Sequence, residues 1–71
     1  MLRLIITQQA RSFTATLDGE EIVSGTTGPL AGSARVLLAR GVDPTTLITM
    51  RHAGKDFDSF EPAPIGQWGI A

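Results

Sequence analysis

The sequence predicts an α+β domain in which one helix packs on a small antiparallel sheet. Only residues 28–44 combine a helix start, an apolar stripe and a helix stop. On both sides of this segment apolar and polar residues alternate, as in half-buried strands. We therefore expect a three-stranded antiparallel meander, the helix, a fourth strand and an irregular C-terminal tail. A fifth strand is left open.

The meander follows from two alternating segments and a turn. Residues 2–8 alternate, and residues 12–17 alternate more regularly, with three apolar side chains on one side and hydroxyl side chains on the other. Asp18-Gly19 is the dipeptide that most favours a two-residue type I′ turn. Residues 20–24 then form the third strand of the meander.

The helix has recognisable ends. Pro29 suits the first helical position, where its missing N–H has no partner, so Thr27 or Gly28 is the expected N-cap. Gly41 can adopt the left-handed C′ conformation, and Val42 then supplies the apolar C″ residue of a Schellman motif. The helix should therefore end just before Gly41.

Helical spacing places one apolar stripe on this segment. The stripe consists of Leu30, Ala34, Val36, Leu37 and Leu38. Ser33, Arg35 and Arg40 fall outside it, and we expect them to be exposed. Gly32 costs the helix roughly 1 kcal/mol relative to Ala, which suggests that a strand passes close to it.

The C-terminal half contains fewer regular patterns. Residues 47–52 are rich in β-branched residues and predict the fourth strand. If a fifth strand forms, we expect it to be short, to span residues 57–60 and to form a hairpin with the fourth strand. Residues 61–71 contain two Pro and two Gly without alternation, which predicts a tail that folds back or binds a partner. We accordingly divide the chain into a domain of residues 1–60 and a tail of residues 61–71.

Composition excludes several classes. The chain has 71 residues, no Cys, 18% charged residues and a net charge of −1. It can form neither a disulfide nor a thiolate metal site, and its balanced charge disfavours bulk DNA or an anionic membrane as partner. The apolar run at residues 4–6 is too short for a signal sequence or a membrane span. We expect a cytoplasmic protein without a membrane association.

No set of residues predicts catalysis. His52 is the single histidine, and Ser59 and Asp58 are near enough in sequence to suggest a triad, but no nucleophile elbow or oxyanion loop accompanies them. Asp56, Asp58 and Glu61 together with His52 lack the spacing of a metal site. We expect no enzyme activity, no cofactor and no bound metal.

The expected function is therefore a protein interaction. Trp68 and Ile70 are large apolar residues in the tail, where they either cover the protein's own core or contact another chain. Ile5 should point away from the helix-covered face, and one of Ile22 and Val23 should do the same, so Ile5 and Val23 join the candidate interface. The sequence favours a small adaptor or inhibitor of a larger protein, with self-association as one form.

The alternative function is nucleic-acid binding. Arg51, His52 and Lys55 form a small basic group, and Phe57 could stack on a base. The acidic residues Asp56 and Asp58 interrupt this group, so we favour a protein partner over nucleic acid.

Four short motifs resemble those of small uncharacterised α+β proteins from alphaproteobacteria and phages. These motifs are Leu17-Asp18-Gly19, Ala34-Arg35-Val36-Leu37-Leu38, Gly41-Val42-Asp43-Pro44 and Met50-Arg51-His52-Ala53-Gly54. The resemblance extends to about Lys55 and implies no activity.

Overall fold

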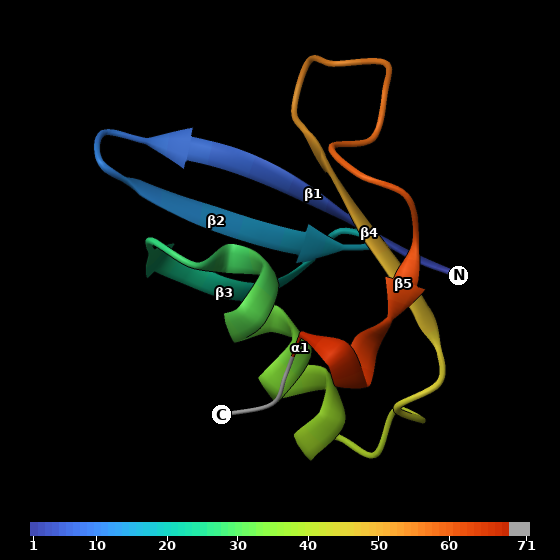
Figure 1. Ribbon diagram of the computed structural model, residues 1–71. Coiled ribbons are helices and arrows are strands. Elements are labelled where there is room, and N and C mark those ends of the chain that lie inside the picture. Colours follow the sequence, from blue (N-terminus) through green and yellow to red (C-terminus); the bar gives the residue numbers. More distant parts are fainter. Residues whose placement is uncertain (69–71) are drawn as a thin grey trace.

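The computed structural model describes residues 1–68, which form one helix packed on a five-stranded sheet (Figure 1). The elements are β1 (Leu2–Gln9), β2 (Ser12–Leu17), β3 (Glu20–Thr26), α1 (Pro29–Ala39), β4 (Leu47–His52), β5 (Ala63–Pro64) and the 3₁₀ helix η1 (Ile65–Gln67). The strands lie in the order β3-β2-β1-β4-β5. The predicted α+β class with its three-stranded meander is confirmed.

The sheet is mixed, whereas the sequence predicts an antiparallel one. β1 pairs antiparallel with β2 but parallel with β4. The reason is the crossover: α1 carries the chain from the β3 edge back over the meander to the far side of β1. A strand that returns through a helix in this way can run parallel to the first strand.

The turn between β2 and β3 has the predicted geometry. Asp18 and Gly19 have φ values of 51° and 84°, the two positive angles that a type I′ turn requires. Beyond it the register shifts, because the adjacent residues Ala15 and Thr16 pair with Val23 and Glu21. The extra residue, Ile22, makes a β-bulge. Ile22 belongs to the core and Val23 packs against it. Two adjacent apolar residues of β3 thus contact the core, whereas the sequence predicts that only one of them does.

Both ends of α1 follow from local sequence. Gly28 is the N-cap, one of the two predicted candidates, and Pro29 begins the helix. At the other end the N–H of Val42 donates to the carbonyl of Leu37 at 3.1 Å, and the N–H of Gly41 donates to that of Leu38 at 3.0 Å. These two bonds and the φ of 95° at Gly41 make the predicted Schellman motif.

The core lies between α1, η1 and the covered face of the sheet. Its buried apolar residues are Leu4, Ile6, Ala15, Ile22, Ala34, Leu37, Ile48 and Ile65. Ser33 is also fully buried, so the prediction that it is exposed is wrong. The physical reason is helical spacing: Ser33 follows Leu30 by three residues and precedes Leu37 by four, so it lies on the same face of α1 as the apolar stripe.

The C-terminal segment takes part in the sheet. Residues 57–60 form no strand, so the predicted position of the fifth strand is wrong. β5 instead pairs antiparallel with the beginning of β4. The following Ile65 is fully buried, and its N–H donates to the carbonyl of Thr46 at 2.8 Å. Ile65 is a single apolar residue between Pro64 and Gly66, so no alternating or helical pattern of apolar residues marks it. For this reason the sequence does not predict that Ile65 is buried.

Candidate interaction surface

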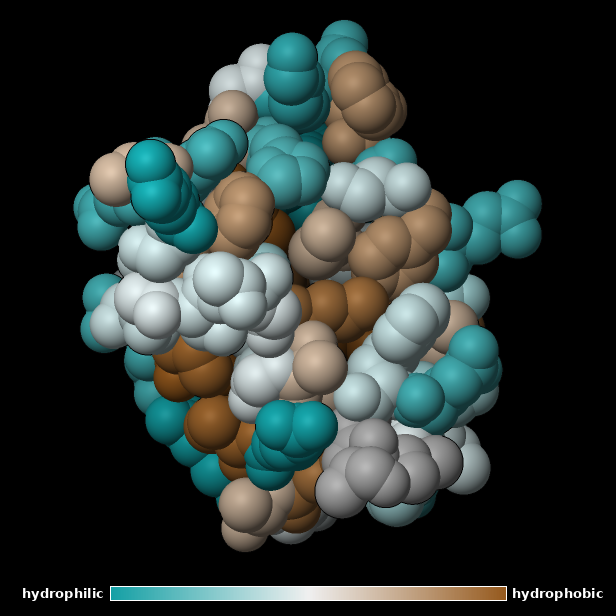
Figure 2. Space-filling model, turned by 60° about the vertical axis from the view of Figure 1, so that its left-hand side comes forward, coloured by the Kyte–Doolittle hydropathy of each residue, from teal (hydrophilic) through white to brown (hydrophobic). Residues whose placement is uncertain are grey.

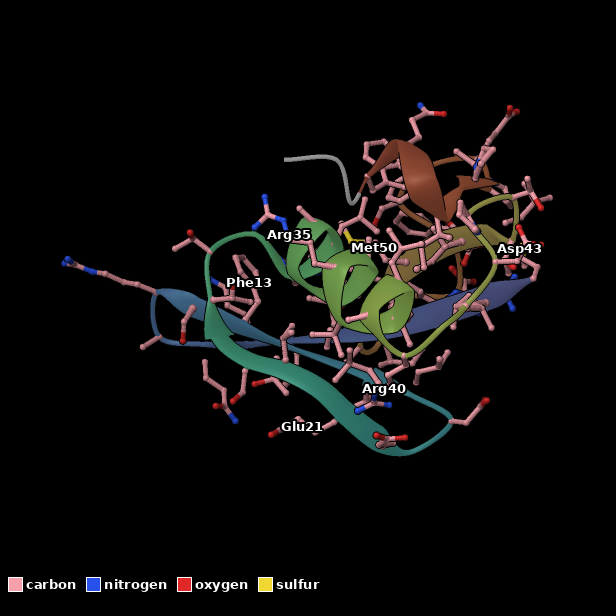
Figure 3. All side chains as sticks on the ribbon, turned by 90° about the horizontal axis from the view of Figure 1, so that it is seen from below. Phe13, Glu21, Arg35, Arg40, Asp43 and Met50 are labelled. Carbon is pink, nitrogen blue, oxygen red and sulfur yellow. The ribbon has the colours of Figure 1, made fainter. Side chains whose placement is uncertain are left out.

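The sheet has one covered face and one open face. Alternation along the strands sends successive side chains to opposite sides. Figure 3 shows Phe13 and Met50 on the side of α1 and Glu21 on the other side. We call the latter side the open face. It includes Arg3, Ile5, Thr7, Gln9, Ser12, Thr14, Thr16, Glu21, Leu47, Thr49 and Arg51.

Two arginines on the open face share one carboxylate. The Nε of Arg3 donates to Oδ1 of Asp58 at 2.9 Å, and its Nη2 donates to Oδ2 at 3.2 Å. The Nε of Arg51 donates to the same Oδ1 at 3.1 Å. Two positive charges thus meet one negative charge, and the cluster keeps a net charge of +1. This geometry holds both guanidinium groups in place while some of their N–H donors stay available.

The cluster also sets the protonation of its members. The hydrogen bond from Arg3 and the positive charges of both arginines lower the pKa of Asp58 below its ordinary value of 3.8. The same bond raises the pKa of Arg3. The Asp58–Arg3 hydrogen bond therefore favours the ionised carboxylate and the charged guanidinium of Arg3.

The loop that carries Asp58 is anchored beside β4. The N–H of Ser59 donates to the carbonyl of Met50 at 2.8 Å, and the hydroxyl of Thr49 donates to the carbonyl of Phe60 at 2.7 Å. Thr49 is fully buried by this arrangement although it belongs to the open face. The loop therefore covers Thr49, while the side chains of Arg3 and Arg51 beside it stay 40% and 31% exposed.

The nucleic-acid candidates do not form one patch. Arg51 and His52 are consecutive strand residues and point to opposite faces. Arg51 contacts Asp58, while His52 lies edge-on to Phe13 with 6.3 Å between the ring centroids. Lys55 and Phe57 are exposed in the following loop. The structure therefore distributes these four residues over both sides of the sheet and the loop beyond it.

The described residues contain no arrangement that resembles a catalytic or metal site. The carboxylate of Asp58 accepts hydrogen bonds from the guanidinium groups of Arg3 and Arg51. The hydrogen bonds of the described residues include none from His52 or Ser59 to Asp58. Within residues 1–68 no three metal-ligating side chains cluster, and no pocket is found there. On the side of the molecule shown in Figure 2, apolar residues are interspersed with polar ones.

The four predicted interface residues are in different surroundings. Ile5 lies on the open face and is 36% exposed. Val23 faces α1 instead, close to Gly32. Trp68 packs against the protein's own core, and the centroids of its ring and that of Phe60 are 5.3 Å apart. Ile70 lies outside the described residues.

The sequence does not predict that Arg3 and Glu21 share the open face, or that Asp58 pairs with Arg3 and Arg51. A signal for Arg3 was present, because it alternates with the buried Leu4 and must point away from the core. Asp58 comes from a loop 55 residues further along the chain than Arg3, and no local pattern relates the two.

Comparison of the chain with models of protein families, with curated proteins and with solved structures finds no match. The resemblance to small alphaproteobacterial and phage proteins therefore stays a prediction. Along the part of the chain described here, no helix has the length and apolar character needed to cross a membrane.

Proposed function

We propose that this protein is a small protein-interaction module that recognises its partner with the open face of its sheet. The observation that carries the proposal is the position of the exposed large apolar residues of the described chain. Met1, Ile5, Leu47 and Phe57 are 60%, 36%, 45% and 62% exposed. Ile5 on β1 and Leu47 on β4 belong to the open face, Met1 directly precedes β1, and Phe57 lies in the loop after β4. None of the four lies on α1, β2 or β3.

The chemistry of the open face supports a macromolecular partner. No pocket is found among the described residues, and such a surface offers little to a small molecule, which usually binds in a concave site. Apolar side chains next to fixed arginines are instead typical of protein interfaces, where arginine is enriched. The mixed charge of the face also disfavours a polyanion.

The test is a comparison of three forms of the protein as bait in a lysate of the source organism. Ile5→Glu places a charge in the middle of the open face, and Arg35→Glu places the same side chain on the exposed outer side of α1. We expect partners that wild type and Arg35→Glu retain to be lost from Ile5→Glu. Identical sets of proteins from all three baits would contradict the proposal.

Circular dichroism provides the control for folding. Ile5 is partly exposed and Arg35 is exposed, so both variants should keep the spectrum of the wild type. If Ile5→Glu unfolds, Ile5→Ser removes most of the apolar surface without a charge and replaces it in the same comparison.

A further inference from the structure

The open face has a basic half and an acidic half, and this division indicates which partner fits. One row of paired residues crosses four strands: Arg51 pairs with Ile5, Ile5 with Thr16, and Thr16 with Glu21. The row begins with a positive charge on β4 and ends with a negative charge on β3. Its two central residues carry no charge, since Ile5 is apolar and Thr16 has a hydroxyl group.

Charges outside this row extend the same division. Arg3 lies beside Arg51 on the basic half, and the two share only Asp58. Asp18 lies in the turn between β2 and β3, at the acidic half. The described contacts include no ion pair of Glu21 or Asp18, whereas Glu20 pairs with Arg40 from α1 at 2.7 Å. Each half of the open face therefore keeps uncompensated charge.

We infer that the open face binds a second copy of this chain. This inference rests on the proposed function and names its partner. Consider a two-fold axis that runs parallel to the strands, in the plane between the two packed sheets, and passes between β1 and β2. This axis places the basic half of each open face over the acidic half of the other copy's open face. Arg51 of one copy then faces Glu21 of the second copy, and the symmetry makes this contact twice.

The spacing of the strands allows this match. Arg51 and Glu21 are three strands apart, which is about 14 Å at ordinary strand spacing. Their midpoint lies between Ile5 and Thr16, where the axis passes. Strands of the two copies then run in line, as in the aligned packing of two sheets in a sandwich.

A second orientation is disfavoured by charge. A two-fold axis perpendicular to the strands, in the plane between the sheets, places Arg51 over the mate's Arg51 and Glu21 over its Glu21. Like charges in an interface cost affinity. The charge pattern thus selects the parallel axis. It also predicts an association that salt weakens, because exposed ion pairs are screened.

The experiment is sedimentation equilibrium of the full chain in low and in high salt. Wild type should associate to a dimer whose dissociation constant rises severalfold between 50 mM and 500 mM NaCl, in line with the screening of exposed charges. Glu21→Lys places a positive charge opposite Arg51 of the mate and should weaken the dimer at least about tenfold. Arg35→Glu changes the charge by the same amount on the exposed outer side of α1, away from the open face, and should leave association unchanged.

Each other outcome has a meaning. A wild type that stays monomeric up to about 1 mM in low salt overturns the inference, as does a dimer that neither salt nor Glu21→Lys affects. A monomer whose Arg51 side-chain NMR signals shift on addition of a blocked Glu-Leu-Glu peptide also overturns the inference, because the basic half then binds acidic groups without a second copy. In these cases the bait comparison with Ile5→Glu decides separately whether the proposed function holds. If Glu21→Lys fails to fold, Glu21→Gln removes the charge and should weaken the dimer to a smaller extent.

Discussion

The covered and the open face of the sheet are built from the same strands but are stabilised by different interactions. On β1, the adjacent residues Leu4 and Ile5 point to opposite faces, and Leu4 is fully buried while Ile5 is 36% exposed. The covered face depends on close packing of apolar side chains. The open face depends on hydrogen bonds and ion pairs around Asp58. The comparison shows that this chain uses one side of a thin sheet for stability and leaves the other side accessible.

The largest expected effect comes from the covered face. Leu4→Ala removes a fully buried side chain and should lower the free energy of unfolding by about 2–5 kcal/mol. In a small domain with a thin core this is a large part of the total stability. Urea denaturation followed by circular dichroism measures the change.

The matched variant on the open face is Ile5→Thr. It keeps a β-branched residue on the strand and should cost less than about 1 kcal/mol, since Ile5 is already partly in water. Equal losses from Leu4→Ala and Ile5→Thr would show that the two faces do not differ in the way described.

The second expected effect tests how closely the layer over the covered face is packed. A Cβ on Gly66 would lie 3.0 Å from Cβ of Pro44 and 3.2 Å from its carbonyl oxygen. The backbone of Pro44 cannot move away easily, because its carbonyl accepts the N–H of Gly66 at 2.9 Å. Gly66→Ala should therefore destabilise the fold by about 1–3 kcal/mol. A thermal melt that matches that of the wild type would mean that η1 is not held against this loop.

What the sequence predicts well is local. The type I′ turn at Asp18-Gly19 depends on two neighbouring residues. The helix C-terminus depends on Gly41 and Val42 and their bonds within one turn. The bounds of β2 and β4 also agree with the predicted ranges, because alternation or β-branched residues mark each of them.

What the sequence does not predict depends on contacts between distant segments. The parallel pairing of β1 with β4 is decided by where α1 delivers the chain. The place of β5 is decided by the burial of Ile65 in the core. The same applies to the candidate site, where Ile5 is identifiable from its strand alone but the link from Asp58 to Arg3 is not.

The third prediction concerns the other glycine of the covered side. A Cβ on Gly32 would lie 3.7 Å from Cγ1 of Val23, an ordinary van der Waals distance. β3 does pass close to this glycine, as the sequence predicts, but it leaves room for a methyl group. Gly32→Ala should therefore raise the free energy of unfolding by about 0.5–1 kcal/mol through helix propensity. A shift of the urea midpoint to lower concentration would show that Val23 cannot accommodate the methyl group.

The smallest expected effect lies on the open face and depends on pH. The pKa of Asp58 is lowered in the folded protein, mainly by the hydrogen bond from Arg3, so ionised Asp58 favours the folded state. This contribution is complete above the ordinary pKa of 3.8 and is lost as the pH falls through the lower folded value. Asp58→Asn should remove it, so the loss of stability between pH 6 and pH 3 should be smaller in the variant than in the wild type.

Asp43 titrates in the same direction and provides the control for this measurement. Its pKa is lowered by hydrogen bonds from the N–H and the hydroxyl of Thr45, in the loop between α1 and β4, and neither Arg3 nor Arg51 takes part in them. Asp43→Asn should flatten the acid side of the stability curve without changing how the arginines bind Asp58, and the effects of the two substitutions should add. If Asp58→Asn leaves the curve of the wild type unchanged, the arginines do not hold Asp58 in solution. The open face would then lack the fixed charges on which its recognition of a second copy depends.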